Sequence, residues 1–356
     1  MVSMYFAQTL VVLWLSKNGF GFNELLIYYI VTFGVALLGI LFSQKIKINA
    51  KASIFWGLLF SALSVLILIK IFGPYQLYLS GLFSGLNVIF FWIPCNIMFF
   101  KYSDDEKRGL NSGMYFLITP IIGITFQPLA GIIAEKFNFE TVFWIGVFSY
   151  IIPTILIKFL PSFEYEINAK KYFLENKFNW STFFQGMSSR ISWALVPIFT
   201  LFFIKTPRDF GNFFGYLALL AAIASVLNGY ISDKIKNRKM FFYVLSFLTV
   251  FSFLPLAFVN NVYYWGIFAG ISSLCINLVN PFWLTFNLDY YKDIGVEKTM
   301  VLREIYLNMG YLATISITLL VFYLTSSPKA SLMVVSIICL LLPMASYLQG
   351  VYRAKI

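Results

Sequence analysis

The sequence predicts an all-α integral membrane protein whose twelve transmembrane helices form two six-helix bundles. Its composition, its succession of apolar segments and its distribution of basic residues support this fold class. Hydrophobic residues make up 60% of the 356 residues and charged residues 12%, whereas soluble domains contain roughly 45–50% apolar and about 25% charged residues. A bilayer crossing needs about 20 mainly apolar residues, so twelve crossings would occupy most of this chain.

Polar breaks divide the chain into twelve apolar segments, which are the expected membrane spans. The first segment is shorter than a bilayer crossing requires, so we expect a truncated first helix. No basic residues precede this segment and no small-residue cleavage site follows it, which argues against a cleaved signal peptide. The segments cover residues 2–16, 25–43, 52–72, 76–100, 110–134, 140–160, 180–203, 211–231, 240–259, 262–288, 299–323 and 330–350.

Lysine and arginine residues are unevenly distributed between alternate loops. If the N-terminus is cytoplasmic, nineteen of them lie on the cytoplasmic side and six on the opposite side. Because basic residues are enriched in cytoplasmic loops, we expect both termini in the cytoplasm and the protein in the cell membrane. The same rule accounts for the net charge of +11 without a nucleic-acid partner.

The longest polar stretch separates the spans into two sets of six. We therefore expect an N-terminal bundle at residues 1–160, a cytoplasmic linker at 161–179 and a C-terminal bundle at 180–356. Short matches recur in the two halves at similar spacing, as a duplicated six-helix unit would produce. The matches pair residues 43–47 with 232–236, Trp92 with Trp283, Asn96 with Asn287 and Lys101 with Lys292.

The loop between the eighth and ninth spans carries the most specific motif of the chain. Gly229 is followed by Asp233 and Lys234, and then by the basic pair Arg238 and Lys239. This pattern resembles the loop signature of the major facilitator superfamily. An ordinary basic cytoplasmic loop is the alternative interpretation.

The loop after the second span is a less complete copy of the same motif. It begins at Gly39 and carries Gln44, where the family usually has an aspartate, followed by Lys45. The resemblance covers nearly the whole chain. It implies the superfamily's fold, transport by alternating access and a gating role for these loop residues. In the fifth span, Pro128 and Gly131 also resemble a motif of the family's antiporters, although a generic kinked helix would contain the same residues.

The residue inventory does not favour an enzyme. The chain has no histidine, which is the commonest general base and metal ligand. Its three cysteines lie inside apolar segments, where they are typical of buried hydrophobic residues rather than of a metal site. No nucleophile–base pair is recognisable, and we expect no cofactor and no metal.

Arg190 is the one ionisable residue deep within a predicted span. It lies about eleven residues into the seventh span, and intramembrane charges are costly and usually functional. Its planar guanidinium could hold a carboxylate or phosphate group of a solute, whereas pairing with an acid or with helix carbonyls is the structural alternative. No acidic residue lies near a span centre, which argues for a uniporter or an anion exchanger over proton symport. Glu304, beside Arg303 near a span end, is interpreted as a gate or a loop salt bridge.

Uncharged polar and aromatic side chains near the span centres complete the candidate substrate-binding set. Because a polar group in hydrocarbon needs a partner, these side chains should face the bundle interior. Hydrogen bonding between helices, and packing, are the alternative roles. In addition to Arg190, the candidate substrate-binding residues are Gln8, Asn87, Thr119, Asn277, Asn280, Trp193 and Tyr311.

These observations predict a secondary active or facilitative transporter that moves a small solute, either an anionic or an amphipathic organic compound, by alternating access. Its expected partners are that solute and the lipid bilayer, with no nucleic acid, and we expect a monomer. The alternative is a membrane sensor or assembly partner that keeps the fold without transporting. The missing central acids favour this alternative, whereas the costly Arg190 argues against it.

Overall fold

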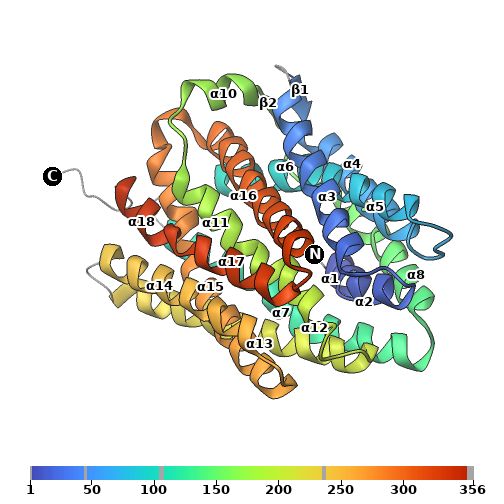
Figure 1. Ribbon diagram of the computed structural model, residues 1–356. Coiled ribbons are helices and arrows are strands. Elements are labelled where there is room, and N and C mark those ends of the chain that lie inside the picture. The colour runs from blue at the N-terminus through green and yellow to red at the C-terminus, as the bar shows by residue number, and fades with distance from the viewer. Residues whose placement is uncertain (1, 44–45, 104–107, 235–237, 351–356) are drawn as a thin grey trace.

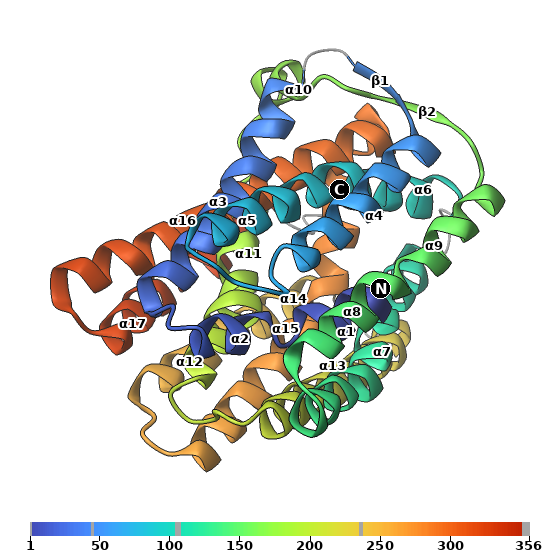
Figure 2. The ribbon, with the colours of Figure 1, turned by 90° about the vertical axis from the view of Figure 1, so that its right-hand side faces the viewer.

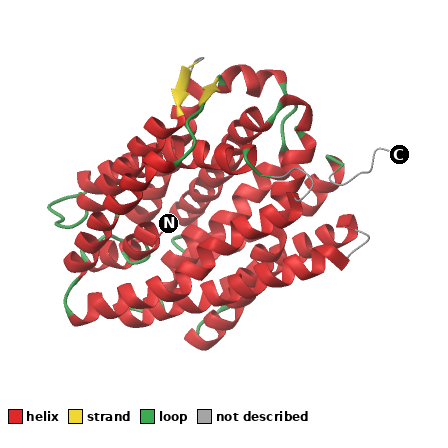
Figure 3. Cartoon of the chain, turned by 180° about the vertical axis from the view of Figure 1, so that it is seen from behind, coloured by secondary structure: helices red, strands yellow, loops and turns green. Residues whose placement is uncertain are grey.

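The computed structural model describes residues 2–43, 46–103, 108–234 and 238–350. These residues form helices that lie side by side, together with one small two-stranded sheet (Figures 1 and 3). The α-helices are α1 (Val2–Gln8), α2 (Val11–Lys17), α3 (Phe22–Phe42), α4 (Ala50–Leu66), α5 (Tyr75–Asn87), α6 (Ile93–Lys101), α7 (Arg108–Lys136), α8 (Phe139–Ser149), α9 (Ile151–Leu156), α10 (Ala169–Glu175), α11 (Trp180–Arg190), α12 (Val196–Thr200), α13 (Pro207–Lys234), α14 (Arg238–Phe253), α15 (Val262–Tyr290), α16 (Val296–Thr325), α17 (Pro328–Cys339) and α18 (Leu341–Leu348). Short 3₁₀ turns lie at Ile157–Phe159, Leu254–Phe258 and Lys292–Ile294.

Helices occupy the predicted apolar segments, but the segments differ in how well they suit a membrane. In the described part of the chain, nine helical spans are long and apolar enough to cross one, where consecutive elements such as α5 and α6, or α17 and α18, count as one span. The third segment contains α4, which is shorter, with 17 residues. The first segment is divided into α1 and α2, of seven residues each. The seventh is helical from Trp180 to Thr200, but it is polar because α11 contains Gln185, Ser188, Ser189 and Arg190.

Side-chain caps explain where several of these helices begin. The first N–H groups of a helix have no acceptor within the helix, and an Asn or Ser side chain at the preceding position can accept from them. Asn49 accepts from the Lys51 N–H at 3.0 Å before α4. Asn179 accepts from the Thr182 N–H at 2.9 Å before α11. The same role belongs to Asn138 before α8, Asn261 before α15 and Ser327 before α17.

The predicted polar linker is structured and is attached to the first half of the chain. Its strand β2 (Glu164–Ile167) pairs antiparallel with β1 (Ile46–Asn49), which follows α3. Tyr165 on β2 is buried, and its hydroxyl is 2.9 Å from the Ser53 hydroxyl. The helix α10 then packs against α3 and α16. The sheet and α10 lie together at one end of the molecule (Figures 1 and 3), which we call the linker end.

The two halves of the chain contact one another most extensively along two helix pairs, and less extensively where α15 meets α7 and α16 meets α6. One pair is α3 with α16, and the other is α7 with α13. In two views at right angles, α16 lies beside α3 and α11 (Figures 1 and 2). Because α3 and α7 come from the first half and α16 and α13 from the second, these two pairs create the space between the halves.

Small residues allow α7 and α13 to approach closely. A Cβ atom added at Gly131 would lie 2.5 Å from the Pro207 carbonyl oxygen and 3.2 Å from the Gly211 Cα. One added at Gly215 would lie 2.5 Å from Pro128. Close backbone approach at small residues is the usual basis of helix packing in membranes. The Pro- and Gly-containing motif of the fifth predicted span therefore has a packing role here.

We expect Gly131→Ala to destabilise the protein by about 1–3 kcal/mol, because the added methyl group overpacks the α7–α13 contact. Thermal unfolding in detergent measures this change. Gly266→Ala in α15 is the matched control, since no described atom beyond the adjacent α15 backbone lies within 4 Å of a Cβ atom at that position. Equal unfolding temperatures for the two variants would contradict the close-packing role of Gly131.

Candidate functional site

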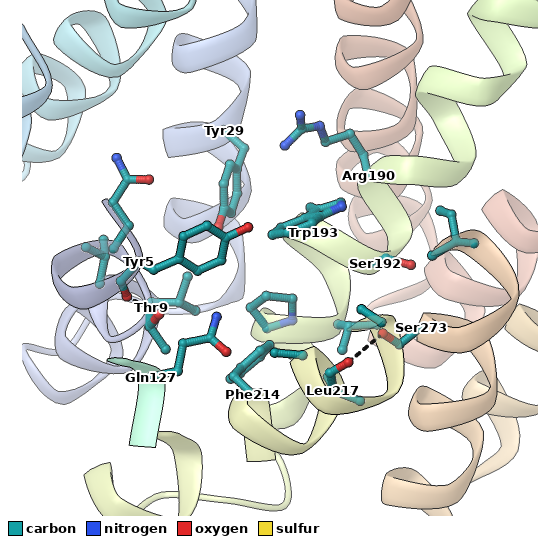
Figure 4. A pocket seen from close by; sticks show the side chains of 18 of the residues that line it. Tyr5, Thr9, Tyr29, Gln127, Arg190, Ser192, Trp193, Phe214, Leu217 and Ser273 are labelled. Carbon is teal, nitrogen blue, oxygen red and sulfur yellow. Dashed lines mark hydrogen bonds between the residues drawn. The ribbon is translucent and has the colours of Figure 1, made fainter. Parts of the chain in front are cut away.

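Helices from both halves of the chain surround a cavity of about 300 Å³ (Figure 4). The first half contributes α1, α2, α3, α5 and α7, and the second half contributes α11, α12, α13 and α15. Most of the wall consists of aromatic and aliphatic side chains. Its polar side chains, apart from tyrosine and tryptophan, are Gln8, Thr9, Thr32, Ser84, Asn87, Gln127, Arg190, Ser192, Ser273 and Asn277.

Two π-helical turns, one in each half, contribute to the wall. They cover Val88–Trp92 and Ile191–Leu195, and each is followed two residues later by a proline, Pro94 or Pro197. A proline lacks the N–H that would bond to the carbonyl four residues earlier. In the first half that carbonyl belongs to Phe90, and the Ser53 hydroxyl donates to it at 2.9 Å. Irregular turns of this kind are frequent at functional sites.

Arg190, at the end of α11, holds the positive charge of the cavity wall. Its Cζ atom lies 3.7 Å from the centre of the Tyr311 ring and 4.4 Å from the centre of the Phe33 ring. Phe33 in turn stacks on Tyr29, with ring centres 5.9 Å apart. In the described part of the chain no acidic side chain forms an ion pair with Arg190. Aromatic faces attract a desolvated cation by about 2 kcal/mol, so these rings hold the guanidinium in place.

A buried polar cluster lies on α16, seven residues before Tyr311. Arg303 Nη1 donates to Glu304 Oε1 at 2.9 Å, and these side chains are 9% and 8% exposed. Asn96 on α6 donates to the same oxygen at 3.3 Å, and the Tyr115 hydroxyl on α7 donates to Asn96 Oδ1 at 2.6 Å. Glu304 also interacts electrostatically with Arg190. Glu304, expected as a gate or a loop salt bridge, does pair with Arg303, and its carboxylate is buried between the halves.

The predicted substrate-binding residues divide into three groups by position. Those that line the cavity are Gln8, Asn87, Arg190, Trp193 and Asn277. Two others lie next to residues of the wall: Tyr311 lies against Arg190, and Thr119 lies close to the Tyr5 hydroxyl. Asn280 is buried but is not part of the wall, because it lies almost one helical turn beyond Asn277, the last residue of α15 that lines the cavity.

A family comparison agrees with this architecture. Residues 1–172 match the family model named Major Facilitator Superfamily. The first half of the chain therefore matches the Major Facilitator Superfamily, whose members are typically transporters and not enzymes. The match and the apolar helices together indicate a multi-pass membrane protein. No curated protein matches the sequence.

Most of the superfamily's loop signature falls outside the described side chains. Gln44 and Lys45 lie outside the described residues. The structure describes no side chain for four further residues of the signature, Asp233, Lys234, Arg238 and Lys239. For Gly229 only the backbone is described, as part of α13. Gly39 is described, and a Cβ atom there would collide with the Ile89 side chain. Gly39 therefore permits close packing of α3 against the π-helical turn after α5.

An apolar cluster joins residues of both halves and of the linker. It joins Ile97 and Phe100 of α6, Tyr165 of the linker and Met300 and Tyr306 of α16. Next to it, Lys101 of α6 and Glu297 of α16 form an ion pair of 2.8 Å. These residues lie nearer the linker end of their helices than the cavity does, so the halves are in contact there.

Sequence reasoning missed several polar groups of the cavity. Gln127 and Ser192 line it, and their Oε1 and Oγ atoms are buried with no hydrogen-bond partner among the described residues. The sequence did not distinguish Tyr5, Tyr29 and Phe33 of the wall from the other aromatic residues, which make up 20% of the chain. Gln127 did carry a signal, because it is an amide inside an apolar segment, next to Pro128.

Proposed function

We propose that this protein is a secondary active or facilitative transporter that moves a small solute by alternating access. Twelve spans would form two bundles, residues 1–160 and 180–356, joined by the linker at 161–179, with both termini in the cytoplasm of a cell membrane. The observation that carries the proposal is the cavity shared by the two halves, with Arg190 in its wall. A site between two halves can face either side of the membrane as the halves rock.

The chemistry of the wall supports an anionic or amphipathic organic solute. Arg190 provides a fork of donors suited to a carboxylate or phosphate group. The remainder of the wall is largely apolar, so a solute with a hydrocarbon body would lose little on leaving water. Pockets for small molecules commonly combine an apolar wall with a few polar groups that orient the ligand.

The contacts at the linker end support a gate on that side. Alternating access requires the ion pair between Lys101 and Glu297 and the bond between Asn96 and Glu304 to break when the halves separate. Each of these contacts joins α6 to α16. The loop-signature residues Gly39, Gln44, Lys45, Gly229, Asp233, Lys234, Arg238 and Lys239 would strengthen the same gate.

A binding screen followed by a flux assay tests this proposal. A ligand that binds only the folded state raises its stability, by about 2.7 kcal/mol at a hundredfold excess over Kd. We expect organic anions from a panel of anionic, neutral and cationic metabolites to raise the unfolding temperature of the purified protein. The same anions should exchange across proteoliposomes and not across empty liposomes. If compounds bind without any flux, the protein is a membrane sensor, and the transport proposal is wrong.

A further inference from the structure

Three polar side-chain atoms of the cavity wall have no hydrogen-bond partner within the part of the chain that the structure describes. They are Arg190 Nε, Ser192 Oγ and Gln127 Oε1, and all three are buried. Buried polar groups in native structures are nearly always paired, and leaving one unpaired is costly. The atoms come from α11, from the π-helical turn that follows it and from α7, so they belong to both halves. A bound ligand would satisfy them together.

The three groups are arranged around the cavity in a definite order. Figure 4 shows Arg190 and Gln127 on opposite sides of the space, with Tyr5, Tyr29 and Trp193 between them. Gln127 is 7% exposed, so bulk water does not satisfy its amide. A ligand that reaches both sides therefore needs an anionic group at one end and a hydrogen-bond donor at the other.

The charges of the wall limit the ligand to one negative charge. Among the described residues that line the cavity, Arg190 is the one cation and none is acidic. An ammonium group would find no carboxylate partner, which disfavours amino acids, and a second anionic group would be buried without a cation. Stacking on Tyr311 uses the face of the guanidinium, so the N–H groups at its edge stay free. That edge matches a planar carboxylate.

The wall between the two ends favours a flat aromatic body. Tyr5 and Trp193 meet edge to face, with ring centres 6.4 Å apart and planes inclined by 66°. Aromatic rings prefer such contacts with one another over contacts with aliphatic groups of similar area. A volume of about 300 Å³ is at the lower end of the range for ligand pockets, which suits a small ring system and not a long acyl chain.

We propose that the cavity selects aromatic monocarboxylates that carry a hydroxyl group opposite the carboxylate. The carboxylate accepts from Arg190, the ring lies among the aromatic side chains, and the hydroxyl donates to Gln127 Oε1. This inference rests on the proposed function, because it names the solute class of the same cavity.

Binding of four related compounds to the purified protein tests the inference. The compounds are 4-hydroxybenzoate, benzoate, cyclohexanecarboxylate and 4-hydroxybenzamide. We expect 4-hydroxybenzoate to bind about fivefold more tightly than benzoate, because it makes one more hydrogen bond. It should bind about a hundredfold more tightly than the uncharged amide, which forms no charged bond to Arg190. Benzoate should bind several-fold more tightly than its saturated analogue.

Gln127→Leu isolates the role of the amide. In this variant we expect benzoate and 4-hydroxybenzoate to bind equally, with the affinity for benzoate kept, which also shows that the variant is folded. The matched control is Gln185→Leu. Gln185 is likewise a buried amide with an unpaired Oε1 atom, but it does not line the cavity. This control should retain the preference for the hydroxyl compound.

The outcomes separate this inference from the proposed function. A preference for the hydroxyl that survives Gln127→Leu, or equal binding of the acid and the amide, would overturn the inference. If proteoliposomes transport another class of solute and the protein binds no aromatic acid, the transporter proposal stands and the inference is wrong. If 4-hydroxybenzoate binds with the expected selectivity but does not cross the membrane, the assigned ligand stands and transport is wrong.

Discussion

Arg190→Gln is expected to weaken the binding of organic anions by about a hundredfold or more. Truncating one partner of a buried charge pair costs about 2–5 kcal/mol, and each 1.4 kcal/mol is a factor of ten in Kd. The fold should survive, because the variant loses stacking on Tyr311 and Phe33 but also removes a buried donor without a partner. We expect the stability to change by less than about 1 kcal/mol, since these effects of about 2 kcal/mol each oppose one another. Calorimetric or fluorescence binding titrations, together with thermal unfolding, measure both quantities.

Arg190→Lys is the matched control for this substitution. Lysine keeps the charge but lacks the planar fork and stacks less well on rings, so we expect an intermediate loss of about tenfold. Anion binding that is unchanged in Arg190→Gln would show that Arg190 does not contact the ligand. A large fall in the unfolding temperature of that variant would instead assign Arg190 a structural role.

Glu304→Gln is expected to lower the free energy of unfolding by about 3–5 kcal/mol. The substitution removes the carboxylate that compensates the buried Arg303, and an uncompensated buried charge carries a penalty of this size. It also removes the electrostatic partner of Arg190 and alters the bond from Asn96. Thermal and denaturant-induced unfolding in detergent measure the loss. The experiment uses the protein without any ligand, so its result does not depend on the identity of the solute.

Two further variants show whether the charge is responsible. Glu297→Gln breaks the ion pair with Lys101 on the same two helices, but those side chains are 34% and 39% exposed, so we expect a loss below about 1 kcal/mol. The double variant Arg303→Met/Glu304→Gln removes both members of the buried pair and should recover most of the stability. Equal losses for Glu304→Gln and for the double variant would show that packing, and not charge compensation, explains the effect.

The sequence could predict the helices because hydropathy is additive along the chain. Nine helical spans of the described chain are apolar and long enough to cross a membrane. The exceptions have local causes. The first segment is broken into α1 and α2, and the seventh tolerates a polar α11 because its Ser, Gln and Arg side chains face neighbouring helices and the cavity. A hydropathy count cannot represent that environment.

The candidate site could be predicted only in part. Arg190 was identifiable because a charge inside an apolar segment is rare, but its aromatic neighbours were not, since Phe33 and Tyr311 are far apart in the sequence. Asn277 and Asn280 looked equivalent in sequence, yet only Asn277 lines the cavity. In the sequence Glu304 lies near the end of a predicted span. In the structure it is buried, because α6 and α7 pack close to α16 at this position.

The sequence by itself determined that this is a helical membrane protein, similar in its first half to the Major Facilitator Superfamily, with a cation inside its seventh apolar segment. Only the tertiary structure decided which side chains face the cavity, which acid is buried and how the linker pairs with the loop after α3. The physical reason is the range of the interactions. Partition into a membrane depends on each segment separately, whereas the cavity wall and the Glu304 cluster depend on how helices from different parts of the chain are rotated against one another.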